Sequence, residues 1–169
     1  IINTWSGKKL ILASKNQFIN SYNFARNSNF VFSETLTVNQ FNNEFASNKN
    51  IEILSKNSQQ ITFQQRNINL NENDIIFCNS SRVELLFYYL SKVRNLNNLK
   101  LITHQTDKTI DEKLFLKKPK CISKWYGINI HFSHKDLIPI PIGIANDYSP
   151  KNLLINDFLH HQPVTSKKT

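Results

Sequence analysis

Blocks of apolar residues in the middle of the chain predict strands and helices in turn. Residues 74–78 (Asp-Ile-Ile-Phe-Cys) form a nearly continuous apolar run, which is typical of a strand covered on both faces. A second apolar run occupies residues 99–103. Between the two runs lies a helical stripe of apolar residues at Val83, Leu86, Leu90 and Val93. A strand, a helix and a strand within about 30 residues predict a parallel pair joined by a crossover, and therefore an α/β fold.

Residue pairs with capping-box spacing mark two helix starts. Ser81 and Glu84 place the start of the central helix at Ser81. Thr109 and Glu112 have the same spacing and predict a short helix, which Pro119 must end because proline cannot continue it. One or two further helical turns are expected over residues 121–126, closed by a glycine.

Shorter patterns predict the remaining elements. Strands are expected at residues 9–13, 29–33, 51–54 and 61–63, and a helix at residues 39–45. The last strand is expected at residues 137–143, short or at a sheet edge because its two prolines lack an N–H to donate. The chain is therefore predicted to be a Rossmann-like α/β domain over residues 1–148. Residues 149–169 are expected to be a linker or tail with one amphipathic piece at Leu153–Leu159.

Polar residues follow three of the predicted strands. They are Asn79-Ser80-Ser81, His104-Gln105-Thr106-Asp107 and Gly143-Ile144-Ala145-Asn146. Because the carboxyl ends of parallel strands meet at one edge, where ligands bind in open α/β sheets, these residues are candidate site residues. Ser80 and Ser81 also open a helix, whose free N–H groups suit a carboxylate or a phosphate.

His104 and Asp107 are the only imidazole and carboxylate placed together at a predicted strand end. A histidine suits general-base work near neutral pH, and a nearby aspartate can orient it. An equally good interpretation is structural, with His104 bonded to loop backbone and Asp107 capping the next helix.

Other chemistry-bearing residues give weaker indications. Trp125 and Tyr126 suit stacking on a sugar ring or a base, although an aromatic pair is more often part of a core. His131 and His134 lack an evident third ligand, so no metal site is predicted. Gly143 after an apolar strand suggests a positive φ or a close backbone approach.

Composition and charge narrow the possible partners. The 169 residues suit one domain, and the net charge of +9 favours anionic partners such as nucleic acid, membrane surfaces or sugar nucleotides. The lysines scatter as pairs, which argues against a nucleic-acid groove. Two cysteines without a partner pattern indicate free thiols and a reducing compartment, and no apolar run is long enough to cross a bilayer. The absence of methionine indicates a fragment or a trimmed beginning.

Three motifs in order give the chain a resemblance to a known family. They are residues 102–107 (Ile-Thr-His-Gln-Thr-Asp), residues 122–126 (Ile-Ser-Lys-Trp-Tyr) with Asn129 and then His134, and residues 138–146 (Ile-Pro-Ile-Pro-Ile-Gly-Ile-Ala-Asn). Over about residues 74–150 the chain resembles the amino-terminal half of bacterial exostosin-like glycosyltransferases. It departs from their pattern in having Gln-Thr for Asn-Ser and Tyr-Gly for Phe-Ala. It also ends at Thr169, where a donor-binding domain would begin.

The resemblance implies the acceptor-side domain of a GT-B glycosyltransferase, which passes a sugar from a nucleotide-sugar donor to a cell-surface glycan. It makes His104 and Asp107 base candidates and places Lys124, Asn129, Gly143 and Asn146 along the cleft. The donor would be a substrate rather than a cofactor. A cytoplasmic location follows, and peripheral association at the inner membrane face is compatible with it. The resemblance leaves open whether this part is active alone.

Two other functions stay open on the sequence. One is a basic nucleic-acid-binding or nuclease-like α/β protein, which needs a continuous basic groove with exposed aromatic residues. The other is a catalytically silent fragment that binds glycan or a partner subunit.

Overall fold

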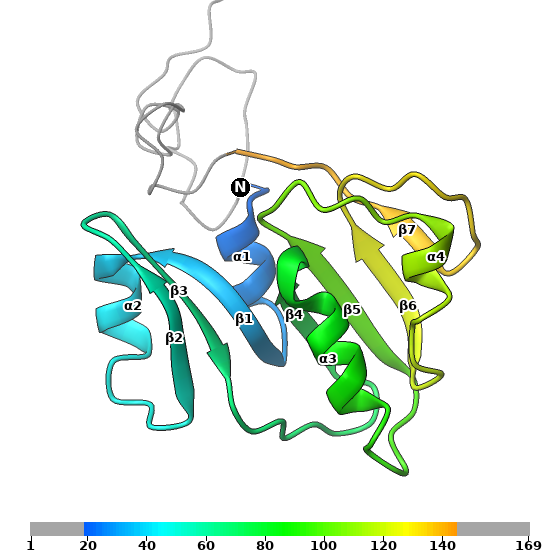
Figure 1. Cartoon of the computed structure of the whole chain (residues 1–169), viewed down its shortest axis with the longest axis horizontal. Helices are drawn as coiled ribbons and strands as arrows, with labels where there is room; N and C mark the ends of the chain where they lie inside the picture. The colour runs from blue at the N-terminus through cyan, green and yellow to red at the C-terminus, as the bar shows by residue number, and fades with distance from the viewer. Residues whose placement is uncertain (1–18, 145–169) are drawn as a thin grey trace, which may run out of the picture.

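The computed structural model describes residues 19–144, which form a seven-stranded sheet with helices on both faces (Figure 1). The strand order is β2-β3-β1-β4-β5-β6-β7. Neighbours from β1 to β7 along this order run parallel, whereas β3 is antiparallel to both β1 and β2. The strands are β1 (Phe30–Thr37), β2 (Ile51–Lys56), β3 (Gln60–Gln65), β4 (Ile75–Asn79), β5 (Leu99–His104), β6 (Ile122–Gly127) and β7 (Leu137–Pro139). The predicted mostly parallel α/β fold is confirmed.

The helices cover the two faces of the sheet unevenly. They are α1 (Ser21–Arg26), α2 (Val38–Glu44), the 3-10 turn η2 (Ser80–Arg82), α3 (Val83–Leu90) and α4 (Glu112–Phe115). On β1, Ser33 contacts Cys78 in the core beneath α3, whereas the next residue, Glu34, pairs with Arg26 of α1. Because successive strand residues point to opposite faces, α1 and α3 lie on opposite sides of the sheet.

Two hydrophobic cores hold these layers together. The larger one joins β4, β5 and β6 to α3 and α4, and includes Trp125, Phe87 and Phe115. The smaller one joins β1 and β3 to α2 through Leu36, Phe63 and Phe41, with Tyr22 of α1 packed against it. Within residues 19–144, every helix is too short or too polar to cross a lipid bilayer.

Most predicted strands are present where the apolar runs placed them. The runs at residues 74–78 and 99–103 are β4 and β5, which are adjacent and parallel. The runs at residues 29–33, 51–54 and 61–63 belong to β1, β2 and β3, and residues 39–45 overlap α2. The last strand, β7, is short and lies at the sheet edge as expected. The strand predicted at residues 9–13 and the tail at residues 149–169 lie outside the described residues.

The helix predicted at residues 121–126 is wrong, because these residues form strand β6. Ile122, Trp125 and Tyr126 are residue types that favour strands, and β5 offers them a parallel partner. Between β5 and β6 the register shifts at Leu99 and Lys100. This irregularity obscures the two-residue alternation that would have indicated a strand.

Both predicted capping boxes are also wrong in detail. The Asn79 side chain accepts from the Ser81 N–H and caps η2, so α3 begins at Val83 rather than at Ser81. The Asp111 side chain, rather than Thr109, caps α4 by accepting from the Leu114 N–H. Helix α3 also ends at Leu90, before the predicted last turn. In each case a nearby Asn or Asp side chain satisfies the free N–H groups first.

Candidate functional site

The carboxyl ends of β1 and β4 form a topological switch point. After β1 the chain turns to α2 and then to β2 and β3 on one side, whereas after β4 it passes through α3 to β5 on the other. Neighbouring parallel strands whose connections diverge in this way leave a ligand-binding crevice at their carboxyl ends. We refer to the carboxyl ends of β1, β4, β5, β6 and β7 as the carboxyl edge.

Gln105 closes the gap between the strands at this switch point. Its side chain accepts from the Thr35 N–H at 2.8 Å and donates to the Thr35 carbonyl at 2.9 Å. The parallel register of β1 with β4 ends at Ser33 and Cys78, so the Gln105 amide occupies the place of a further strand residue. Gln105 has a φ of 79°, in the left-handed region that non-glycine residues seldom adopt. The sequence placed Gln105 among the polar residues that follow a strand but gave it no role of its own, because its partner lies 70 residues away.

The residues after β4 are held by their own hydrogen bonds. Asn79 accepts from both the backbone N–H and the hydroxyl of Ser81, at 3.0 and 2.7 Å. The Ser80 hydroxyl is buried and donates to the His104 carbonyl at 3.0 Å. Ser81 is exposed at the carboxyl edge. Of the two predicted serines, Ser81 is therefore the one that a ligand can reach.

His104 is buried beneath the segment that follows β7. Its Nδ1 accepts from the Gln105 N–H at 2.8 Å, so the neutral ring carries its proton on Nε2. Nε2 lies beside the carbonyls of Pro141 and Ile142 without a hydrogen bond of normal geometry. Burial lowers the pKa of His104, and these two carbonyls oppose that effect. The ring also lies 5.9 Å from that of Phe24 in α1.

Asp107 lies near His104 in sequence but is not hydrogen-bonded to it. It is exposed in the loop after β5, and neither ring nitrogen of His104 has a carboxylate partner. The structure therefore does not pair the two residues as an oriented base. Asp107 is the accessible carboxylate of this loop, whereas His104 is enclosed.

Asn129 and Gly143 bring two further loops to the carboxyl edge. Asn129 follows β6 with a φ of 54°, and its side chain lies 3.5 Å from the Thr106 carbonyl. Gly143 has a φ of 71°, and a Cβ there would lie 2.0 Å from the Ile19 carbonyl oxygen. The Ile144 N–H donates to the same oxygen at 2.8 Å. The positive φ and close approach that the sequence suggested for Gly143 are thus present.

Two predicted site residues lie away from this edge. Trp125 is fully buried between the rings of Phe87 and Phe115 and donates from its indole N–H to Thr103. This corrects the expectation that Trp125 lines a cleft and confirms its alternative interpretation as core. Lys124 forms an ion pair with Asp136 at 2.7 Å, nearer the amino end of β6. Asn146 lies outside the described residues.

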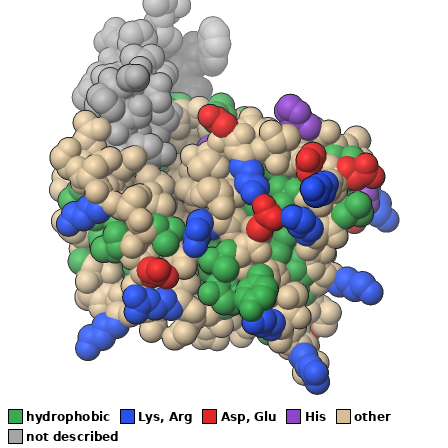
Figure 2. Space-filling view, viewed as in Figure 1, with side chains coloured by type: hydrophobic (Ala, Val, Ile, Leu, Met, Phe, Trp, Pro, Cys, Tyr) green, Lys and Arg blue, Asp and Glu red, His purple; other side chains and the backbone are tan. Residues whose placement is uncertain are grey.

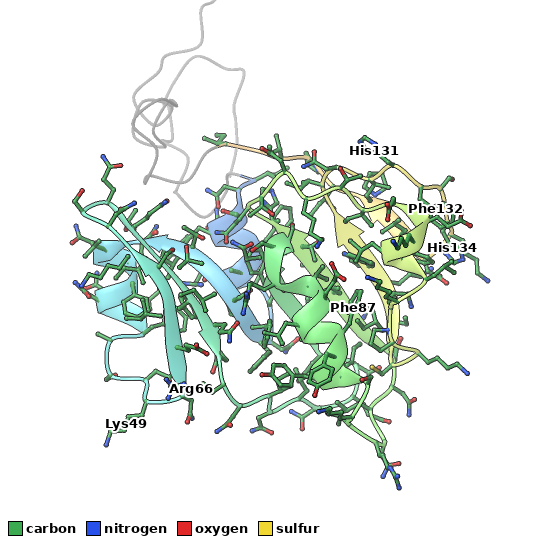
Figure 3. The ribbon with its side chains drawn as sticks, viewed as in Figure 1. Lys49, Arg66, Phe87, His131, Phe132 and His134 are labelled. Carbon is green, nitrogen blue, oxygen red and sulfur yellow. The ribbon has the colours of Figure 1, made fainter. Side chains whose placement is uncertain are left out.

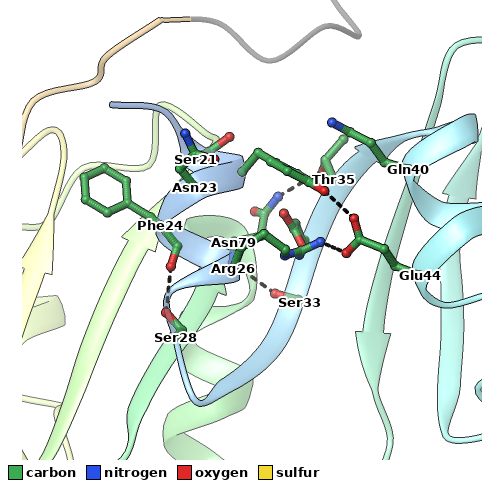
Figure 4. A network of polar contacts seen from close by, with 12 residues as sticks. Ser21, Asn23, Phe24, Arg26, Ser28, Ser33, Thr35, Gln40, Glu44 and Asn79 are labelled. Carbon is green, nitrogen blue, oxygen red and sulfur yellow. Dashed lines mark hydrogen bonds and ion pairs between the residues drawn. The ribbon is translucent and has the colours of Figure 1, made fainter. Parts of the chain in front are cut away.

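A cluster of one arginine and two glutamates lies beside the switch point, and sequence reasoning did not find it. Arg26 of α1 contacts both Glu34 of β1 and Glu44 of α2. Figure 4 shows the contact of Arg26 with Glu44. The Glu34 side chain is fully buried, and one of its oxygens has no partner. Burial raises the pKa of Glu34 to about 8, even though Arg26 lowers it. The cluster ties α1 and α2 to the central strand.

Basic side chains do not gather into one groove on the face that Figure 2 shows. Lys and Arg are spread over the face in Figure 2 with Asp and Glu between them, rather than gathered along one groove. His131, Phe132 and His134 lie together at the β7 end of the molecule (Figure 3). Within residues 19–144, no three His, Cys, Asp or Glu side chains gather closely enough to hold a metal ion.

No family model, curated protein or solved structure matches the chain.

Proposed function

We propose that this chain is the acceptor-side part of a glycosyltransferase, which transfers a sugar from a nucleotide-sugar donor to a cell-surface glycan. The glycan acceptor would bind at the carboxyl edge, over the ends of β4, β5 and β6. The motif resemblance to exostosin-like glycosyltransferases suggests the reaction, and the geometry of this edge supports the location.

The observation that carries the proposal is the convergence of the three motifs. The side chain of Asn129 from the second motif lies against the Thr106 carbonyl of the first. The Pro141 and Ile142 carbonyls of the third motif lie against the His104 ring of the first. The Ile140 N–H of the third motif also donates to the Gly127 carbonyl at 3.0 Å. Segments far apart in the sequence thus form one edge, which begins beside the switch point.

The accessible groups at this edge suit a polyhydroxylated ligand. Ser81, Asp107 and Asn129 are exposed there and offer a hydroxyl, a carboxylate and an amide. Asp107 is the residue we assign as the base that accepts a proton from the acceptor hydroxyl. His104 supports the loop from below, because its neutral ring accepts the Gln105 N–H.

The proposal is tested by titrating the full chain with a panel of bacterial surface oligosaccharides, followed by calorimetry or NMR. We expect an oligosaccharide to bind and Asp107→Asn to weaken it about tenfold, which corresponds to about 1.4 kcal/mol of binding energy. The matched control is Glu72→Gln, because Glu72 hydrogen-bonds Asn97 near the amino ends of the strands.

Two results would count against the proposal. One is a folded chain that binds no oligosaccharide in the panel. The other is binding to DNA or RNA that weakens steeply with salt, which would favour the nucleic-acid alternative. Nucleotide sugars are included in the titration, since donor binding by the chain would contradict its assignment to the acceptor side.

A further inference from the structure

Arg82 lies beside the switch point, and its side chain reaches across the central strand. It belongs to the 3-10 turn η2, which follows β4 directly and leads into α3. Its Nε and Nη2 atoms both donate to the side-chain oxygen of Gln64, at 3.0 and 2.6 Å. Gln64 belongs to β3, and β1 lies between β4 and β3 in the sheet. The Arg82 side chain therefore crosses β1 to make this contact.

The sheet face that the Arg82 side chain crosses is polar. Gln64 is the register neighbour of Ser33 on β1, and Thr62 of β3 is the register neighbour of Thr35. The hydroxyl oxygens of the two threonines are 2.9 Å apart. These residues point to the side of the sheet on which α3 lies, whereas α1 and α2 pack against the other side of β1. This part of the face therefore carries hydroxyl and amide groups.

The charge of Arg82 has no acidic partner among residues 19–144. A guanidinium has five N–H donors, and the three that do not bond to Gln64 have no partner in the described part of the chain. Gln64 is neutral, and its amide nitrogen donates to Glu52 at 2.9 Å, so that carboxylate binds the amide rather than the guanidinium. Arg26 is half-buried like Arg82 but contacts two glutamates, whereas Arg66 is exposed to water.

A guanidinium that is held in place with free N–H groups suits an oxyanion. Arginine binds carboxylate and phosphate groups through paired N–H donors, and the contact with Gln64 orients the Arg82 side chain before a ligand arrives. Helix α3 starts at the next residue and adds the partial positive charge of a helix N-terminus. We propose that Arg82 binds a carboxylate or phosphate group of the acceptor, so that the acceptor is an acidic glycan. This inference rests on the proposed function and adds the class of acceptor to it.

The test compares acidic with neutral sugars on the full chain. Glucuronate, glucose 6-phosphate, glucose and inorganic phosphate are titrated separately while NMR follows the Nε–H signal of Arg82. We expect both acidic sugars to shift this signal and glucose to leave it in place. The acidic sugar that binds more tightly identifies the group as a carboxylate or a phosphate.

Two variants assign the binding to the guanidinium. Arg82→Gln should weaken the binding of the acidic sugars about tenfold, as measured by calorimetry. The matched control is Arg66→Gln, which removes the same charge from an exposed residue that follows β3 (Figure 3). Because β3 is antiparallel to β1, Arg66 lies away from the carboxyl edge, and its variant should bind as the unaltered chain does. If Arg82→Gln fails to fold, the Arg82 signal of the unaltered chain still decides the matter.

The outcomes separate this inference from the proposed function. Acidic and neutral oligosaccharides that bind equally, with the Arg82 signal unmoved, would overturn the inference and leave the proposed function standing. A signal that moves with the acidic sugars, in a chain that binds no oligosaccharide, would support the anion site and contradict the proposed function. Inorganic phosphate that binds as tightly as glucose 6-phosphate would overturn the inference, because the site would then take the free ion without the sugar.

Discussion

The Gln105 side chain pairs with the backbone of Thr35, 70 residues away, through one donated and one accepted hydrogen bond. Thr35 is 9 % exposed, so without Gln105 its N–H and carbonyl would have little water to bond with. The amide therefore completes the sheet at the point where β4 turns away from β1. It also holds the loop that carries Asp107 against the central strand.

We expect Gln105→Ala to lower the free energy of unfolding by about 2–3 kcal/mol, because it leaves two nearly buried backbone groups unpaired. Urea denaturation followed by circular dichroism measures this loss. Gln59→Ala is the control, since Gln59 is exposed and the change should stay within about 0.5 kcal/mol. Equal stability of the two variants would show that the Gln105 amide contributes nothing to the sheet.

Glu34 should make the protein less stable as the pH rises toward 8. Its pKa is raised to about 8 in the folded state from an ordinary 4.5, so between these values the folded chain holds a proton that the unfolded chain has lost. The contribution of Glu34 to stability is therefore largest below pH 4.5 and is lost as the pH rises through 8, by at most about 1.4 kcal/mol per pH unit. Denaturation curves between pH 7 and 9 should show this slope levelling off above pH 8, and Glu34→Gln should remove it.

The control for Glu34 is Glu84→Gln. The lysines at positions 108 and 117 hold the pKa of Glu84 at about 2, so its titration lies far below the measured range. The slope between pH 7 and 9 should persist in this variant. A slope that survives Glu34→Gln would assign the pH dependence to another group.

His104 should have the opposite effect at lower pH. Burial lowers its pKa below 6.5, so the unfolded chain takes up a proton before the folded chain does. The stabilisation is present above pH 6.5 and is lost as the pH falls through the folded-state pKa. Protonation would also place a donor at Nδ1 against the Gln105 N–H. NMR titration of the imidazole should give a pKa below the ordinary value of 6.5, and an equal or higher value would refute this account.

Gly143→Ala should destabilise the protein more than Gly127→Ala. At position 143 an alanine meets both a φ of 71° and the Ile19 backbone, and the left-handed conformation alone costs about 1–2 kcal/mol. At position 127 the new Cβ would lie 2.6 Å from the Ile110 side-chain end and 2.9 Å from the Thr103 hydroxyl, which are side-chain atoms. Thermal denaturation of both variants tests the order, and a reversed order would contradict it.

Local patterns predicted the elements whose own residues determine them. The runs that became β4 and β5 are apolar throughout, and their parallel pairing follows from the helix between them. Strand β6 was missed because its pairing partner, rather than its own periodicity, makes it a strand. Caps were misplaced by one or two residues because several side chains competed for the same N–H groups.

The candidate site was predictable only in outline. That the residues after β4, β5 and β6 share one edge follows from the parallel sheet. The burial of His104 and its separation from Asp107 do not follow from the sheet, because they depend on α1 and on the residues after β7. The contacts of Arg26 with Glu34 and Glu44 join α1, β1 and α2. No local sequence pattern within any one of these elements indicates them.

The central position of β1 constrains the order in which the chain folds during synthesis. Its antiparallel partner β3 is complete at residue 65, whereas its parallel partner β4 ends only at residue 79. While residues 66–79 emerge from the ribosome, one edge of β1 has no strand beside it, and unpaired edges favour aggregation. A pause in translation over this interval would therefore lower the yield of folded protein, and rapid translation through it would protect the nascent chain.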